Sequence, residues 1–431
     1  MMEKEIAFRG LAALTEDTAV KAQVRFDNWT KHELYVQNGR LSLLRTTHDP
    51  HLAQTVITGS RRGSYSSNRT DAEGIRLGAA TALKLAQASP EDSAYDIAEK
   101  QPAETFLNGP EEPDRELMYT RLASFLEEVR EHHPHVIIKE AGLSFDFCRS
   151  AFLNSNGVDF SAVDGSYNFF VLFSSKKAGI TTSFNHTWCS MRDLSRHLLD
   201  RGTVRETLAR SEKELEAGPF RGKTEGDIVI DPDCMAFLIY MWCGTFIADG
   251  KLIAGTSPLK DSLGKDVAAA ALTLRSEPRS EELTSNYFYT RNGYKAENSV
   301  IIDRGVLRSF LLSLYGSRKT GKPRAVNDGE CHVVDAGGCS RDDLVSSVKR
   351  GLYVVRISGG HPNDRGDFSF VAKNSFLIEN GEIAAPVNEV MISGNMLDLF
   401  RNIRGISRER INFGACIYPW VLAGPLVISG K

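Results

Sequence analysis

Residues able to carry acid–base chemistry gather in one short glycine-rich stretch, residues 358–369, which reads SGGHPNDRGDFS. His361 with Asp364 or Asp367 can form an acid/base pair, because an imidazole beside a carboxylate can accept and return a proton. Asp and Asn beside Pro and Gly are also what a tight turn requires. Taken alone, the residues leave two interpretations open, a catalytic loop and a shaped turn.

Three other groups contain metal-capable or nucleophilic side chains: EHHPH at 131–135, NHTWC at 185–189 and CHVVDAGGC at 331–339. Structural zinc needs ligands that converge on one point, usually from two paired sets. The histidines of the first group lie at the end of an expected helix, where their side chains diverge. We therefore interpret the first group as a solvated helix end and the other two as structural cysteines and turns.

Charge and composition exclude several classes of protein. The net charge of -3 leaves no basic surface for nucleic acid. No apolar run approaches the roughly 20 residues that span a bilayer, so no membrane association is expected. The seven cysteines are odd in number and form no CxxC pair, which favours reduced thiols and a cytoplasmic location.

The elements that would position these side chains follow from periodicity and turn chemistry. Asn38-Gly39 and Asn380-Gly381 each separate two alternating runs, which is typical of type I′ hairpins. Because hairpins outnumber strand–helix–strand alternation, we expect an α+β fold with mainly antiparallel sheets and packed helices. The pattern predicts helices at 1–14, 72–87, 114–133, 192–213 and 233–249, and strands at 135–147, 151–159 and 166–185.

Two domains are expected from the length of 431 residues. The segment EAGPFRGKTEGD at 216–227 is the preferred boundary. We assign an N-terminal α+β domain to 1–220 and a β-rich C-terminal domain to 221–431.

Several ordered motifs resemble those of the TldD/PmbA family, once called modulators of DNA gyrase. They include SVIIDRGVLRSFLLSLYG, GLYVVRISGGHPNDRGDFSF, FLIENGEIAAPV and GNMLDLF, together with GSRRGSYSSNRTDAEGI near the start of the chain. The resemblance implies zinc-dependent proteolysis of peptides by a pair of related subunits. In the catalytic kind, an HExxxH motif on the first helix of the C-terminal domain holds zinc, and a later cysteine is a further ligand.

The corresponding helix in this sequence departs from that motif. Aligned on the glycine before the second histidine, HExxxH becomes YMWCGT, so Tyr240 and Thr245 occupy the ligand positions and Met241 that of the base. Tyrosine and threonine are not usual zinc ligands, and methionine cannot act as a base. Cys416 falls roughly where the family places its cysteine, but a lone thiolate will not hold zinc. The chain therefore resembles the TldE/PmbA-type subunit without a metal site, with residues 233–249 as a degenerate metal helix.

This resemblance implies a non-catalytic subunit that binds an extended or unfolded peptide, while a TldD-type partner supplies zinc. No cofactor is expected in this chain. Gly359, Gly360, His361 and Asn363 are then expected to contact the peptide. Two departures from the family pattern, His361 and the aromatic stretch NYFYTRNGYKAEN at 286–298, suggest a specialised paralogue.

Two alternatives remain open at this point. One is an autonomous, zinc-independent enzyme that uses His361 with Asp364 or Asp367. The other is a homodimeric peptide-binding protein without catalysis.

Overall fold

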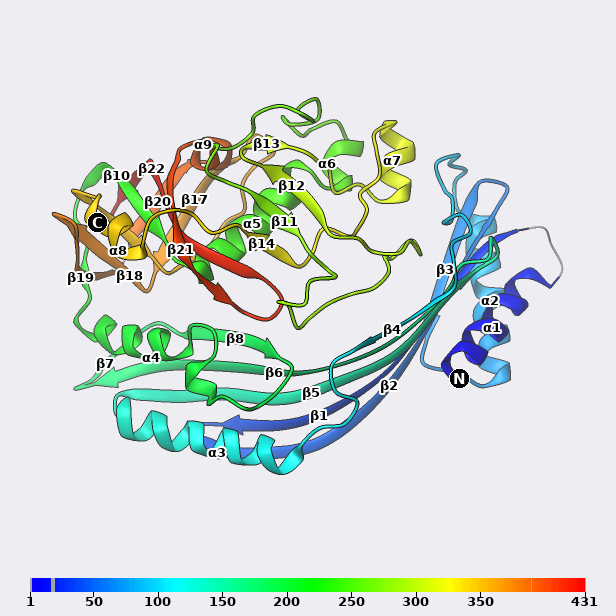
Figure 1. The fold of residues 1–431 in the computed structure, drawn as a ribbon, viewed down its shortest axis with the longest axis horizontal. Helices are drawn as coiled ribbons and strands as arrows, with labels where there is room; N and C mark the ends of the chain where they lie inside the picture. Colours follow the sequence, from blue (N-terminus) through cyan, green and yellow to red (C-terminus); the bar gives the residue numbers. More distant parts are fainter. Residues whose placement is uncertain (1, 17–19, 389, 431) are drawn as a thin grey trace.

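The structure is a computed structural model that describes residues 2–16, 20–388 and 390–430. Two large sheets dominate it, and the long curved first sheet holds the second sheet on its concave side (Figure 1). Most of the strand pairs are antiparallel. The expected α+β class is therefore confirmed.

The first sheet is built from the N-terminal half in the order β3-β2-β1-β5-β6-β4, with β7 and β8 also paired to β6. Its strands are β1 (Lys21–Gln37), β2 (Arg40–Thr58), β3 (Arg61–Ser67), β4 (Glu104–Asn108), β5 (Val136–Asn154), β6 (Asp159–Lys177), β7 (Ile180–Thr181) and β8 (Asn185–Met191). Its helices are α1 (Met2–Thr15), α2 (Ala72–Ala88), α3 (Arg115–His132) and α4 (Val204–Lys213). Helices α1, α2 and α3 pack apolar side chains against the face turned away from the second sheet (Figure 1).

The second sheet runs β13-β12-β11-β14-β22-β10-β15-β18-β19-β9, with β16, β17, β20 and β21 attached beside this path. Its strands are β9 (Gly218–Pro219), β10 (Lys223–Ile230), β11 (Leu274–Ser276), β12 (Ser299–Asp303), β13 (Val306–Leu307), β14 (His332–Val334), β15 (Arg350–Val354), β16 (Arg356–Ser358), β17 (Asp367–Lys373), β18 (Ser375–Glu379), β19 (Glu382–Asn388), β20 (Val390–Asn395), β21 (Ile403–Asn412) and β22 (Ile417–Ser429). The helices here are α5 (Pro232–Phe246), α6 (Asp249–Ile253), α7 (Leu314–Thr320), α8 (Arg341–Ser346) and α9 (Met396–Arg401). None of the helices in the described part of the chain combines the length and apolar character needed to cross a membrane.

Both Asn-Gly predictions are confirmed in detail. Asn38 and Gly39 have φ of 49° and 70°, and Asn380 and Gly381 have φ of 52° and 83°. Positive φ at both central residues is the requirement of a type I′ turn. These turns join β1 to β2 and β18 to β19.

Several expected boundaries in the first half are wrong. The strands predicted at 135–147 and 151–159 are one continuous strand, β5, followed by a second long strand, β6. Small and polar residues near position 150 look like a break, but cross-strand pairing to β1 and β6 continues through them. The helix predicted at 192–213 is reduced to α4, because turns that include Gly202, with φ of 52°, occupy the preceding residues.

The aromatic stretch 286–298 joins the two halves of the molecule. The ring of Phe288 stacks on Phe106 of β4 at 5.2 Å, and the hydroxyl of Tyr289 lies 2.6 Å from that of Ser150. These rings belong to one buried cluster with aromatic residues of β4, β5 and β6. The first sheet ends at Met191 and the second begins at Gly218, and the division at 220/221 stays a prediction.

Candidate functional site

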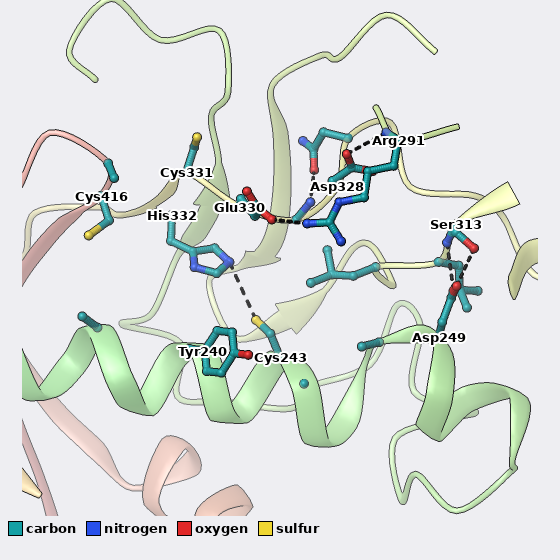
Figure 2. Close-up of a pocket in the computed structure, with 18 of the residues that line it drawn as sticks. Tyr240, Cys243, Asp249, Arg291, Ser313, Asp328, Glu330, Cys331, His332 and Cys416 are labelled. Carbon is teal, nitrogen blue, oxygen red and sulfur yellow. Dashed lines mark hydrogen bonds and ion pairs between the residues drawn. The ribbon is translucent and has the colours of Figure 1, made fainter. Parts of the chain in front are cut away.

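A pocket of about 710 Å³ opens beside α5 (Figure 2). Its walls come from α5, the segments around residues 291 and 313, the turn leading into β14, and the start of β22. It is lined by Trp188, Ala236, Tyr240, Cys243, Gly244, Ala248, Asp249, Arg291, Asn292, Leu311, Leu312, Ser313, Asn327, Asp328, Gly329, Glu330, Cys331, His332, Ala415, Cys416 and Tyr418.

The start of α5 is fixed by a buried polar network around Asp231. This carboxylate caps the helix by accepting from the backbone N–H of Asp233 at 3.2 Å. It also pairs with Arg210 at 2.8 Å and accepts hydrogen bonds from Tyr353 at 2.7 Å and Trp420 at 3.1 Å. Because these partners come from α4, β15 and β22, the network sets the position of the helix against the sheet.

Of the three residues predicted to stand at the positions of the zinc motif, Tyr240, Met241 and Thr245, one reaches the pocket. The side chain of Tyr240 is 71% exposed and lines the pocket (Figure 2), whereas Met241 is buried in the core. Thr245 is partly exposed and lies outside the pocket lining. A turn further along α5, Cys243 and Gly244 also face the pocket.

At the base of the pocket, which we call its floor, a thiol lies close to an imidazole. Cys243 Sγ lies 4.0 Å from His332 Nε2 (Figure 2). Burial raises the pKa of Cys243 to about 12 and lowers the pKa of His332 to about 4. Both groups are therefore neutral near pH 7, so this thiol is not activated as a thiolate nucleophile.

Two more cysteines, Cys331 and Cys416, line the same pocket, and burial raises the pKa of each to about 12. A metal held here would need at least three ligands whose geometry converges. Within residues 2–16, 20–388 and 390–430, no three His, Cys, Asp or Glu side chains are placed to hold a metal ion. The residues present do not fit a zinc site.

The opposite wall of the pocket is charged. Arg291 pairs with Glu330 at 2.6 Å, and its backbone N–H donates to Asp328 at 2.9 Å (Figure 2). Burial raises the pKa of Asp328. Asp249 accepts a hydrogen bond from the backbone N–H of Ser313 at 2.9 Å. The pocket thus combines an uncharged floor of aromatic, thiol and imidazole groups with one polar wall.

The SGGHPNDRGDFS loop lies outside this pocket lining. Asn363 shapes the loop, because its Oδ1 accepts from the backbone N–H of Arg365 at 2.9 Å and of Asp367 at 3.0 Å. Gly359 and Gly360 have φ of 78° and 68°, the left-handed conformation that glycine adopts without strain. The suggested contact of these residues with a peptide stays a prediction.

The same loop does not pair its histidine with an aspartate. His361 is exposed and makes no hydrogen bond within the described part of the chain. Asp364 is paired with Lys251 of α6, and Asp367 accepts from Asn395 at 2.9 Å. An acid/base role for His361 with either carboxylate also stays a prediction.

Most residues of this pocket carry no signal in the sequence that would bring them together. Cys331 and His332 looked like structural residues, and they are buried or half-buried as that interpretation required. His332 lies 89 residues from Cys243 in the sequence. The pairing of β14 with β11 and β22 brings both residues of this group opposite Cys243. One part of the helix-end interpretation is wrong, because His133 is buried and lies 2.9 Å from Glu212.

Comparison with known proteins finds relatives in sequence and in fold. Residues 223–430 match the PmbA/TldA metallopeptidase C-terminal domain. The chain is 30% identical over 286 residues to a metalloprotease of Methanothermobacter thermautotrophicus, an alignment that covers 62% of each chain. It is 25% identical over 421 residues to the metalloprotease PmbA of Escherichia coli O157:H7, covering 92% of this chain and 91% of that one.

Solved structures show the same fold. The crystal structure of TldE from Thermococcus kodakarensis superposes with a TM-score of 0.83 at 20% identity and covers 100% of both chains. Residues 223–430 therefore resemble the C-terminal domain of the PmbA/TldA metallopeptidases, and the whole chain is similar to PmbA in sequence and to TldE in fold.

Proposed function

We propose that this chain is the TldE/PmbA-type subunit of a zinc metallopeptidase and that it does not itself carry out catalysis. One observation carries the proposal: α5, the helix that the resemblance aligns with the zinc motif, presents Tyr240 and Cys243 to the pocket of about 710 Å³. The nearest imidazole, that of His332, is neutral and is accompanied by thiols whose pKa values burial has raised. The zinc and the water-activating base would then belong to a TldD-type partner.

The pocket also supports binding of an extended or unfolded peptide. A volume of about 710 Å³ is enough for a few residues of an extended chain, within the size range of ordinary ligand pockets. The exposed ring of Tyr240 offers a flat apolar contact that tolerates different side chains. Polar groups on the opposite wall, such as Asn292 and Glu330, offer hydrogen bonds to a peptide backbone.

We place this complex in the cytoplasm. All seven cysteines are free thiols in the structure, which supports a reducing compartment.

The proposal is tested by purifying the chain alone and together with a TldD-type protein that contains HExxxH. Zinc is measured by plasma mass spectrometry, and cleavage of an unfolded peptide by chromatography. The chain alone should bind no stoichiometric zinc and cleave nothing, whereas the pair should contain zinc and cleave the peptide. Replacing the glutamate of the partner's HExxxH by glutamine should abolish cleavage without separating the two chains.

Stoichiometric zinc together with peptide cleavage by the isolated chain would refute the proposal. The His361→Ala variant distinguishes the autonomous-enzyme alternative by its kcat. Loss of a peptide contact raises KM and leaves the kcat of the pair unchanged, whereas loss of a catalytic base lowers kcat.

A further inference from the structure

The first sheet has an unpaired edge along half of its second strand. β2 pairs with β1 over its whole length, but β3 pairs only with its residues 52–58. No strand in the described part of the chain hydrogen-bonds to the outer edge of residues 40–51. An exposed edge of this length is a template for pairing with another chain.

The same edge is apolar on the face that carries α3. Leu41 is 43% exposed, Leu44 is 72% exposed, and Tyr119 of α3 is 56% exposed. Leu41 and Tyr119 line a small pocket of about 170 Å³, and Leu44 lines a second of about 180 Å³ against Met118. A strand added at this edge would cover these leucines and fill the hollows between β2 and α3.

The position of Pro50 indicates which backbone groups of β2 point away from β1, toward the unpaired edge. In the register of β1 with β2, Pro50 lies opposite Asn28. Proline has no N–H to donate, so this pair is a non-hydrogen-bonded one. Because the two kinds of pair alternate along antiparallel strands, the even-numbered residues of this part of β2 direct their C=O groups outward, and all of them except Pro50 also direct an N–H outward.

We propose that a second copy of this chain pairs with this edge, β2 against β2 in antiparallel orientation, with the two-fold axis at Thr47. This register places Arg45 of one copy opposite Asp49 of the other, twice across the axis. Arg45 already pairs with Glu33 at 2.7 Å on the same face, so the partner's carboxylate would complete the coordination of the guanidinium. Opposite charges directly across a strand pair are favourable, and like charges are unfavourable.

Neighbouring registers lack this complementarity. An axis at Arg45 or at Asp49 would set two like charges against each other. An axis at Thr47 also sets Thr46 opposite His48, which repeats the contact that His32 makes with Thr46 at 2.9 Å within the chain. The two α3 helices then lie on the same side of a joined sheet, each beside an exposed Leu44.

This interface is independent of the proposed function. None of residues 40–51 lines the large pocket beside α5, so the pocket remains available to peptide and to a catalytic partner. Absence of peptidase activity in the complex would therefore say nothing against the pairing of two copies.

A cysteine placed on the axis tests the register. The variant is Thr47→Cys in a Cys339→Ser background, because Cys339 is the exposed thiol among the native seven. In a non-hydrogen-bonded pair the two Cα atoms lie about 4.5 Å apart, which a disulfide spans. Mild oxidation should convert most of the protein to a covalent dimer on a non-reducing gel.

Thr46→Cys in the same background is the matched control. Its two copies lie about 8 Å or more apart in this register, too far for a disulfide. It should remain uncrosslinked under the same oxidation. Equal crosslinking of the two variants, or none at position 47, would overturn the proposal.

Light scattering of the native chain provides the second measurement. A dimer is expected at tens of micromolar concentration, and Leu44→Asp should raise its dissociation constant at least tenfold while leaving the circular dichroism spectrum unchanged. A monomer at every concentration tested would overturn the proposal. So would a dimer that Leu44→Asp does not weaken.

Discussion

At the scale of single residues, the pocket is defined by an aromatic ring, a thiol and an imidazole. Tyr240 presents an exposed aromatic ring, and Cys243 and His332 form a neutral pair at 4.0 Å. Such a floor can bind an apolar or aromatic side chain but has no charge to polarise a carbonyl. The chemistry of binding and the chemistry of cleavage are then expected on different chains.

We expect Tyr240→Ala to weaken binding of an unfolded peptide about tenfold, equivalent to about 1.4 kcal/mol, because an exposed aromatic contact is lost. Fluorescence anisotropy with a labelled peptide measures the effect. Phe237→Ala is the matched control, since Phe237 is 38% exposed on the same helix and does not line the pocket. Equal affinities for the two variants would contradict this role for Tyr240.

Glu214 gives the protein a predictable dependence of stability on pH. It accepts a hydrogen bond from Asn185 at 2.9 Å, and burial raises its pKa to about 7. Since the pKa of glutamate in an unfolded chain is about 4.3, the folded state binds a proton that the unfolded state has lost between these values. The contribution of Glu214 to the free energy of unfolding therefore falls as pH rises from about 4 to 7.

Glu214→Gln should remove this dependence. We expect the variant to be more stable than the native chain at pH 8 by about 1–2 kcal/mol, allowing for solvent screening of a partly exposed side chain. The two proteins should have similar stabilities near pH 4. Urea unfolding at both pH values tests this, with Glu216→Gln at an exposed site nearby as the control. A stability difference that does not change with pH would contradict the assignment.

At the scale of secondary structure, tight hairpins hold the long strands in register. The two Asn-Gly turns have the same backbone conformation but different surroundings. A Cβ on Gly381 would lie 2.7 Å from the carbonyl oxygen of Ser346, whereas a Cβ on Gly39 would meet nothing within 4 Å. Gly381 is therefore packed closely against a neighbouring segment, whereas Gly39 faces open space.

The substitution Gly381→Ala should consequently cost more than Gly39→Ala. Backbone strain at positive φ costs about 1 kcal/mol at either site, and the contact with Ser346 should bring the loss at Gly381 to about 2 kcal/mol or more. Equilibrium unfolding in urea gives both values. If Gly39→Ala were as destabilising as Gly381→Ala, the packing argument would fail.

At the scale of the whole molecule, two sheets are held together by an aromatic segment inserted between them. Phe288 is 8% exposed and stacks on Phe106, and the guanidinium of Arg279 lies 5.1 Å from the Phe288 ring centroid. The packing of Phe288 on the first sheet also helps to position the pocket beside α5, because Arg291 of the same segment lines that pocket.

Phe288→Ala should destabilise the native state by about 3 kcal/mol, as expected when a buried aromatic side chain is removed. We also expect thermal unfolding to separate into two transitions, because the joint between the sheets is weakened. Leu107→Ala on β4 is the control, as Leu107 is 73% exposed and should have little effect. Differential scanning calorimetry of both variants tests this prediction. A single unshifted transition for Phe288→Ala would show that other contacts hold the two sheets together.

Features that depend on neighbouring residues could be predicted from the amino-acid sequence. Asn380-Gly381 specified its turn, Asp231 or Asp233 could cap the following helix, and the apolar run at 233–249 specified a buried helix. These follow from φ preferences, capping and periodicity, which act over a few residues. The continuous course of β5 could not be read in the same way, because its pairing with β1 and β6 holds it extended through residues that would otherwise suggest a break.

The composition of the pocket depends on the tertiary fold. No pattern in the sequence predicts the contact between His332 and Cys243. His361, which the sequence made the strongest catalytic candidate, lies on an exposed loop outside the pocket lining. Sheet topology brings β14 and the start of β22 over α5, and the burial that results makes the thiol and the imidazole neutral. Local sequence sets which element forms, whereas the protonation state and the neighbours of a side chain depend on which distant elements cover it.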